Sequence, residues 1–306
     1  MSSVKEKLSA WLALSRLPFH TVGLLPFVLG GVLAWQQAEA FSWAIFAWGA
    51  LGVMLVMLAT YYAGEYWDYI EDAYSAHLGA SRFSGGSGVL QRGLLPHRAA
   101  LWASLVSMAL ALGTALVLRL VYDTGPWTLP FMILGLLGGF FYSTQPIRWV
   151  RTGAGELWIA FCYGWLPVAA AYYLQRGHII PIVHWMALPI GLSIFNVILL
   201  NEFPDYVADT AADKRNLTVR LGHERASIRA GAAGVGSGLG RGLSVGPAGR
   251  QRALYFSAPG LPLSAVLVVL GLRGRWRERA VLEQLCGANL LVNLGTTASY
   301  MAAFLL

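Results

Sequence analysis

The amino-acid sequence predicts an all-α protein, a polytopic membrane bundle of about nine transmembrane helices, on three observations. Of the 306 residues, 57% are hydrophobic and only 12% are charged, whereas a soluble chain carries roughly 25% charged residues. Apolar stretches of about 20 residues recur along the chain, and each is long enough to cross ~30 Å of hydrocarbon. Basic residues fall in the short gaps between these stretches, a pattern typical of cytoplasmic loops.

The hydrophobic stretches define eight clear candidates for membrane spans. In order, they lie near residues 17–36, 43–66, 99–121, 127–145, 154–174, 181–203, 253–272 and 286–306. A ninth span fits near 226–247. With nine spans and a cytoplasmic N-terminus, 17 of the 22 basic residues face the cytoplasm, whereas eight spans place the four arginines of 273–279 outside. We therefore predict nine spans.

The ninth span overlaps the part of the chain least suited to a helix. Residues 231–249 contain eight glycines together with Arg241 and Pro247. Glycine is about 1 kcal/mol less favourable than alanine in a helix interior, and an arginine at bilayer depth costs about 2.5 kcal/mol or more. This segment is therefore a loop, a helix held by its neighbours, or an abnormal stretch of sequence.

No linker divides the rest of the chain, so we expect one transmembrane domain over residues 1–306. The first ten residues are polar, and no cleavage site with small residues follows the first apolar stretch, which favours a retained helix over a secretory signal. The net charge of +7 does not follow one amphipathic face, which argues against a nucleic-acid partner. Cys162 and Cys286 lie in apolar stretches and match neither a disulfide framework nor a zinc motif.

Acidic side chains are scarce, and two groups of them close the second and sixth spans on the same predicted side. These groups are Glu65, Asp68, Glu71 and Asp72 in GEYWDYIED, and Asp205, Asp209 and Asp213 in NEFPDYVADTAADKRN. Successive aspartates four residues apart share one face of a helix, where like charges repel. A divalent cation relieves this repulsion, and oxygen ligands suit Mg²⁺, whose coordination is usually completed by water and substrate phosphates.

Two such clusters therefore predict Mg²⁺-dependent binding of one diphosphate between them. We expect the metal ligands, which are also the catalytic residues, to be Asp68, Asp72, Asp205 and Asp209. The glycines of SRFSGGSGVLQRG, which follow the first cluster, permit close backbone approach to phosphate. We expect substrate-binding roles for Glu65, Arg82, Tyr142, Arg148, Asn201, Asp213 and Lys214. For the basic residues, anchoring at the cytoplasmic face is an alternative, and for Tyr142 a place in the interfacial aromatic belt.

At these residues the chain resembles the UbiA superfamily of intramembrane prenyltransferases, and within it the 1,4-dihydroxy-2-naphthoate prenyltransferases of menaquinone synthesis. The family's first motif, Asn-Asp-x-x-Asp-x-x-x-Asp, is matched at 64–72 with Gly64 and Glu65 in place of the first two residues. The second motif, DxxxDxxxD, is matched at 205–213. The segments FYSTQPIRW, GAGEL and NLTVRLG are similar to further segments of the menaquinone branch.

The resemblance implies a bundle around a central cavity, with the aspartates at its cytoplasmic mouth, in the inner (plasma) membrane. It also implies that two Mg²⁺ ions help to ionise a polyprenyl diphosphate, and that an aromatic acceptor attacks the resulting carbocation. The expected acceptor is 1,4-dihydroxy-2-naphthoate. 4-Hydroxybenzoate, homogentisate, haem and chlorophyllide are alternatives within the family.

Two other classes of membrane protein also use acidic residues. A cation-coupled transporter needs carboxylates near the middle of its spans, whereas these lie at span ends. A CDP-alcohol phosphotransferase begins its motif with Asp-x-x-Asp-Gly, which this chain lacks. Both classes are therefore disfavoured.

Overall fold

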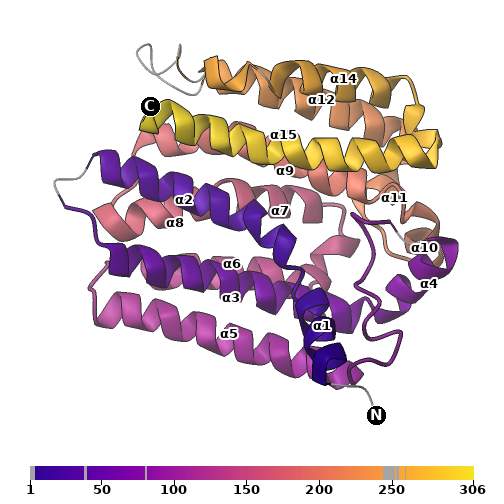
Figure 1. The fold of residues 1–306 in the computed structure, drawn as a ribbon, viewed down its shortest axis with the longest axis horizontal. Helices are drawn as coiled ribbons and strands as arrows, with labels where there is room; N and C mark the ends of the chain where they lie inside the picture. The colour runs from indigo at the N-terminus through magenta and orange to yellow at the C-terminus, as the bar shows by residue number, and fades with distance from the viewer. Residues whose placement is uncertain (1–3, 38–39, 80, 244–251, 253–254, 259) are drawn as a thin grey trace.

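Helices that run along a common direction make up an elongated bundle (Figure 1). The computed structural model describes residues 4–37, 40–79, 81–243, 252, 255–258 and 260–306. This part of the chain is helical and contains no strand, which confirms the predicted all-α class. Five helical segments in it are long and apolar enough to cross a membrane, and two shorter helices are apolar as well. The protein is thus a polytopic membrane bundle, and the count of nine spans stays a prediction.

The elements follow the predicted hydrophobic stretches closely. In chain order they are α1 (Val4–Leu14), α2 (Thr21–Gln36), α3 (Trp43–Trp67), α4 (Tyr69–Gly79), α5 (His97–Leu120), α6 (Thr128–Ser143), α7 (Gly155–Gly164), α8 (Leu166–Arg176), α9 (Pro181–Asn201), α10 (Tyr206–Ala211), α11 (Leu217–Leu221), α12 (His223–Leu243), α14 (Gly260–Leu272) and α15 (Arg279–Leu305). Short 3-10 turns occupy Leu17–His20, Trp149–Arg151 and Arg275–Arg277.

Two predicted spans differ in detail from the helices found. The span at 154–174 consists of α7 and α8, because Pro167 in the first turn of α8 has no N–H to continue the hydrogen-bond ladder of α7. The last span begins earlier than predicted, since α15 starts at Arg279. Of the predicted span at 253–272, α14 forms the later part, while residues 253–254 and 259 lie outside the described part of the chain.

The glycine-rich segment is helical as far as Leu243, where α12 ends. This helix packs against α9 and α14. A side chain at Gly240 would meet Pro189 of α9 within 2.8 Å, and one at Gly234 would meet Val268 of α14 within 3.0 Å. Small residues allow membrane helices to approach closely. Of the three interpretations of this segment, a helix held by its neighbours is therefore the one found, and residues 244–249 lie outside the described part.

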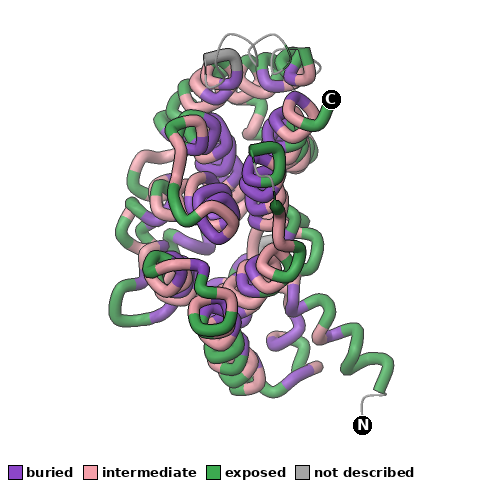
Figure 2. Tube along the Cα trace, turned by 90° about the vertical axis from the view of Figure 1, so that its left-hand side faces the viewer, coloured by how far each residue is buried: buried purple, intermediate pink, exposed green. Residues whose placement is uncertain are grey.

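The outer surface of the bundle is apolar, as a lipid-facing surface requires. On α5, Trp102, Val106 and Leu110 recur every four residues and are all more than half exposed. Figure 2 views the bundle along its helices and shows the buried turns facing the interior and the exposed turns facing outward. The outer surface of the bundle thus exposes hydrophobic residues that are unfavourable in water and favourable in lipid.

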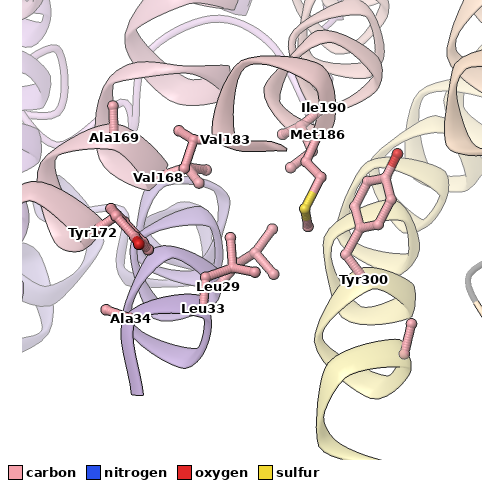
Figure 3. Packing of buried hydrophobic residues seen from close by; sticks show 11 residues of the cluster. Leu29, Leu33, Ala34, Val168, Ala169, Tyr172, Val183, Met186, Ile190 and Tyr300 are labelled. Carbon is pink, nitrogen blue, oxygen red and sulfur yellow. The ribbon is translucent and has the colours of Figure 1, made fainter. Parts of the chain in front are cut away.

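A buried apolar cluster joins four helices at the end of the bundle away from α4, α10 and α11 (Figures 1 and 3). Its members include Leu29 and Leu33 from α2, Val168 and Tyr172 from α8, Met186 and Ile190 from α9, and Tyr300 from α15. Most of these side chains are no more than 1% exposed. This packing holds the four helices together at one end of the bundle. The acidic residues near α4 and α10 lie at the opposite end.

Candidate functional site

A polar cavity lies at the end of the bundle where α4, α10 and α11 gather (Figure 1). Its empty volume, which includes space open to solvent, is about 1200 Å³. Asp68 and Asp72 line it from the junction of α3 and α4, and Asp205 and Asp209 line it from the start of α10. The four predicted metal ligands therefore face one space, because α4 packs against α10.

The first cluster is partly neutralised by cations. Asp68 ends α3, and its Oδ1 accepts a hydrogen bond from Arg148 Nη2 at 2.8 Å while Ser143 donates to its Oδ2. Arg148 also binds Glu71 at 2.9 Å. Asp72 has no such ion pair among the described residues, and burial raises its pKa well above the usual range, with Asp68 adding to the effect. Burial thus favours the protonated form of Asp72, and a cation bound beside it would favour the carboxylate.

In the second cluster, Asp209 is bound by neighbouring side chains. Asp209 lies 3.4 Å from Lys214 Nζ through Oδ1 and accepts a 2.7 Å hydrogen bond from Asn216 Nδ2 through Oδ2. Burial raises the pKa of Asp209 to about 6 even though Lys214 opposes this shift. Burial would lower the pKa of Lys214, but the four aspartates around it raise it. Lys214 is therefore a charged group common to both clusters.

The glycine loop after α4 reaches both clusters. Any side chain at Gly86 would collide with the carboxylate of Asp72, and one at Gly85 would lie 3.9 Å from Asp205 Oδ1. Gly85 also has φ +74°, a left-handed conformation that favours glycine. These glycines thus lie against the aspartates of both clusters, and their close approach to phosphate stays a prediction.

The oxygen donors of the cavity fit Mg²⁺. The described residues that line it include aspartate and glutamate side chains and neither cysteine nor histidine, and Mg²⁺ prefers oxygen ligands. Among the described residues no three metal-binding side chains are already close enough to hold an ion. Such an open arrangement suits an ion whose shell is completed by water and substrate phosphates. Asp72 and Asp205 would hold it most directly, with Asp68 and Asp209 beside them.

Two residues predicted to bind substrate lie away from the cavity. Asp213 is exposed and pairs with Arg215 at 2.9 Å. The four-residue spacing fails here because α10 ends at Ala211 and Asp213 adopts a left-handed φ of 53°. Arg82 is exposed as well, and its backbone N–H donates to Glu283 of α15.

The other predicted residues lie in or beside the cavity. Tyr142, Asn201, Lys214 and Glu65 line it, and Arg148 reaches it through Asp68. Glu65 is already engaged, since Ser87 donates to it through both its backbone N–H (2.7 Å) and its hydroxyl group (2.9 Å). Its carboxylate therefore holds the glycine loop in place.

Two further residues that line the cavity are not predicted from the sequence. Arg16 lines the cavity, binds Glu65 at 2.9 Å and donates to the carbonyl of Gly85 at 2.7 Å. In the sequence it looks like any cytoplasmic arginine near a first span. Asn216 caps α11 and orients Asp209, and only its place shortly after the second cluster marks it.

An apolar chamber adjoins the polar cavity deeper in the bundle. Its empty volume is about 820 Å³. Thr60, Ile159 and Tyr163 line both spaces, so the two are adjacent. The chamber continues along α3 from Thr60 to Gly49, which is about 16 Å at the 1.5 Å rise of a helix. The combined site therefore has a charged mouth and a long apolar interior.

Comparison with proteins of known sequence gives matches at low identity. The 1,4-dihydroxy-2-naphthoate octaprenyltransferase of Bacillus subtilis (strain 168) is 23% identical over 212 residues, 67% of this chain and 64% of that protein. The enzyme of the same name from Escherichia coli (strain K12) is 24% identical over 226 residues, 72% of this chain and 71% of that protein. The chain thus spans about two thirds of the length of these relatives.

Solved structures share the fold. A UbiA homologue from Archaeoglobus fulgidus bound to GPP and Mg²⁺ has a TM-score of 0.68 at 16% identity, covering 97% of this chain and all of that one. The apo structure of a UbiA homologue from Aeropyrum pernix K1 has a TM-score of 0.65 at 15% identity, with 92% and 96% covered. The sequence profile of the UbiA prenyltransferase family matches residues 24–292, which is most of the chain. The chain belongs to the UbiA prenyltransferase family.

Proposed function

We propose that this protein transfers a prenyl chain from a polyprenyl diphosphate to an aromatic acceptor, 1,4-dihydroxy-2-naphthoate, in a Mg²⁺-dependent reaction of quinone synthesis. The observation that carries the proposal is the meeting of four aspartates and Lys214 in one cavity that lies next to an apolar chamber. The polyprenyl diphosphate likewise has a charged part, the diphosphate, and an apolar part, the prenyl chain. The naphthoate acceptor is supported by the names of the Bacillus and Escherichia relatives.

The charged mouth binds the diphosphate in this proposal. When bound between the aspartates, Mg²⁺ neutralises charge on the diphosphate oxygens. Lys214 supplies a fixed positive charge on the same side, and Arg148 and Asn216 hold Asp68 and Asp209 in position. The allylic C–O bond breaks with its electron pair on the departing diphosphate, and groups already oriented toward that charge stabilise it without reorganising.

The apolar chamber receives the prenyl chain and excludes water from the carbocation. It is lined by aliphatic, aromatic and small residues, and Tyr163 and Ile159 stand where it meets the mouth. The orientation with a cytoplasmic mouth, the single domain and the location in the inner (plasma) membrane belong to the same proposal, supported by the positive-inside distribution of arginine and lysine.

Metal removal tests the reaction. We expect membranes containing the protein to transfer labelled geranylgeranyl diphosphate to 1,4-dihydroxy-2-naphthoate, and we expect EDTA to abolish this transfer and added Mg²⁺ to restore it. A panel containing 4-hydroxybenzoate and homogentisate tests the acceptor. No EDTA-sensitive product with any acceptor would overturn the proposal, and product with another acceptor alone would overturn the choice of naphthoate.

Filling the apolar chamber should shorten the chains that the protein accepts. A Cβ at Gly135 would lie 3.6 Å from Val56 and 3.7 Å from Leu166, which is ordinary contact, so Gly135→Ala should fold and act normally. Gly135→Leu adds more volume inside the chamber and should reduce transfer of geranylgeranyl groups at least about tenfold, equivalent to 1.4 kcal/mol. Transfer from dimethylallyl diphosphate, whose short chain stays near the mouth, should change little. Equal losses with both donors would show that the chamber does not hold the chain.

A further inference from the structure

A second carboxyl pair, Glu156 and Glu202, is buried beside the polar cavity and apart from the aspartates. Glu156 opens α7 and is 0% exposed, and Glu202 follows α9 and is 8% exposed. The two helices pack against each other. Glu202 lines the cavity, and its carboxyl group is close enough to that of Glu156 to share a hydrogen bond when one of them is protonated. The pair thus presents one member to the ligand space.

Each carboxyl group has one oxygen held and one oxygen free. Glu156 Oε1 accepts from the backbone N–H of Leu217 at 2.7 Å, and Glu202 Oε2 accepts from that of Thr218 at 3.2 Å. Glu156 Oε2 and Glu202 Oε1 are buried without a hydrogen-bond donor among the described groups. A buried oxygen without a donor is costly. One proton between the two free oxygens satisfies both, as in other pairs of adjacent carboxyl groups.

No cation among the described residues forms an ion pair with Glu156 or Glu202. The acids that do form ion pairs near the cavity are Glu65, Asp68, Glu71, Asp209 and Asp213. With one shared proton the pair carries one negative charge and has room for a second proton. A cluster of acids held by neither Arg nor Lys is a poor structural anchor, and it is suited to accept a proton from a ligand.

The position of the pair matches the border between the two parts of the site. Ile159, one turn beyond Glu156 on α7, lines both the polar cavity and the apolar chamber. Tyr142 interacts electrostatically with both carboxyl groups. The carbonyl oxygen of the Asn201 side chain, next to Glu202, is also buried without a donor and lines the cavity. A ligand hydroxyl at this wall would therefore meet the Glu202 carboxyl group and the Asn201 carbonyl oxygen, which belong to consecutive residues.

We propose that Glu202, positioned by Glu156, is the base that takes the hydroxyl proton of the aromatic acceptor. This inference rests on the proposed prenyl transfer and identifies the acceptor side of that site. It requires an acceptor with a hydroxyl group on its ring. Glu202 is the catalytic residue because it faces the ligand, and Glu156 acts through it.

The step balances without a further reactant. The O–H bond of the acceptor breaks, its electron pair stays on oxygen, and the proton joins the Glu156–Glu202 pair. The C–O bond to diphosphate breaks with its electron pair on diphosphate, and the activated ring carbon then bonds to the resulting prenyl carbocation. The group displaced from that ring carbon leaves its bonding pair in the ring: a proton passes to the departing diphosphate, and a carboxylate leaves as carbon dioxide. The carboxyl pair then returns its proton to the oxygen.

The test compares Glu202→Gln with the wild type in membranes, using geranyl diphosphate, Mg²⁺ and 1,4-dihydroxy-2-naphthoate. We expect kcat to fall by about 10²–10⁴-fold, the range for loss of a general base, while the KM for geranyl diphosphate stays unchanged. The exposed Glu278, which pairs with Arg275 on the surface, provides the control variant Glu278→Gln, which should retain wild-type rates.

A series of naphthols of graded hydroxyl acidity separates a base from a structural residue. The loss caused by Glu202→Gln should shrink steadily as the acceptor hydroxyl becomes more acidic, because an ionised acceptor needs no base. Glu156→Gln should show the same trend with a smaller loss of about 10–100-fold, comparable to that for groups that orient metal ligands. If Glu202→Gln does not insert into membranes, Glu156→Gln decides the question in the same series.

The outcomes distinguish this inference from the function on which it rests. A wild type that transfers no prenyl group to any acceptor overturns the proposed function. A wild type that is active while Glu202→Gln retains its rate within about twofold overturns only the role of the pair. A loss of equal size across the whole naphthol series overturns it as well, since a merely structural defect affects all acceptors alike.

Discussion

Asp209→Asn should lower the rate of prenyl transfer by about 10³-fold, the range for removing one group that stabilises developing charge. The substitution keeps the shape of the side chain and leaves an oxygen for the hydrogen bond from Asn216, but it removes the negative charge that faces Lys214 and the metal site. The measurement is kcat in membranes at saturating Mg²⁺, with immunodetection to show equal insertion. Raising the Mg²⁺ concentration should recover part of the activity.

Asp213→Asn is the matched control for this prediction. It makes the same chemical change in the same acidic segment, four residues further on, but Asp213 is exposed and pairs with Arg215. We expect wild-type transfer within about twofold. If both variants lost activity equally, Asp213 would belong to the metal site, as the DxxxDxxxD spacing predicts and as its position beyond the end of α10 does not. If Asp209→Asn kept its activity, Asp209 would have no part in the site.

Arg16→Met should destabilise the fold by roughly 3 kcal/mol or more, the range for breaking a buried ion pair. The side chain of Glu65 is 0% exposed, and the substitution leaves its charge without the cation that lies 2.9 Å away. It also removes the hydrogen bond that Arg16 donates to the carbonyl of Gly85. The measurement is the thermal unfolding midpoint of the detergent-purified protein, which should fall clearly below that of the wild type.

A double substitution shows whether the lost stability comes from the unpaired charge. When Arg16→Met is combined with Glu65→Gln, the buried charge is gone, and the amide oxygen of the new side chain can still accept from the backbone N–H of Ser87. The double variant should therefore unfold at a higher temperature than Arg16→Met alone. If Glu65→Gln lowered the midpoint by the same amount in the Arg16→Met background as in the wild type, the two side chains would act independently. The ion pair would then contribute nothing to stability.

The scaffold was predictable because hydrophobic length carries most of the information about a membrane helix. The stretch at 181–203 became α9 within two residues, and 43–66 became α3 within one. Pro167 was visible in the sequence, but hydrophobicity continues on both sides of it, so the break between α7 and α8 was missed. The helical state of 231–243 depends on contacts with α9 and α14. The free-energy costs of single glycine and arginine residues in a helix do not include these contacts.

The site was predictable only where local spacing held. Asp68 and Asp72 come together because the backbone stays helical between them, with Asp72 N–H bonded to the carbonyl of Asp68 at 2.8 Å. The same rule failed at Asp213, where the helix had already ended. Arg16 reaches Glu65 across 49 residues, and Glu156 reaches Glu202 across a comparable separation. No spacing rule detects such pairs, since only the packing of helices brings them together.

The absence of a side chain at Gly139 has a consequence for variation in this protein. Its α-carbon faces the hydroxyl of Thr60 so closely that even one added carbon atom would collide with it. Both residues border the apolar chamber. Gly139→Ala would therefore push α3 and α6 apart at the depth where the chamber meets the mouth, and a paired change of Thr60 to a smaller residue would be needed to accommodate it. Natural variation at these two positions should accordingly be linked. A side chain larger than glycine at position 139 should occur only together with a side chain smaller than threonine at position 60.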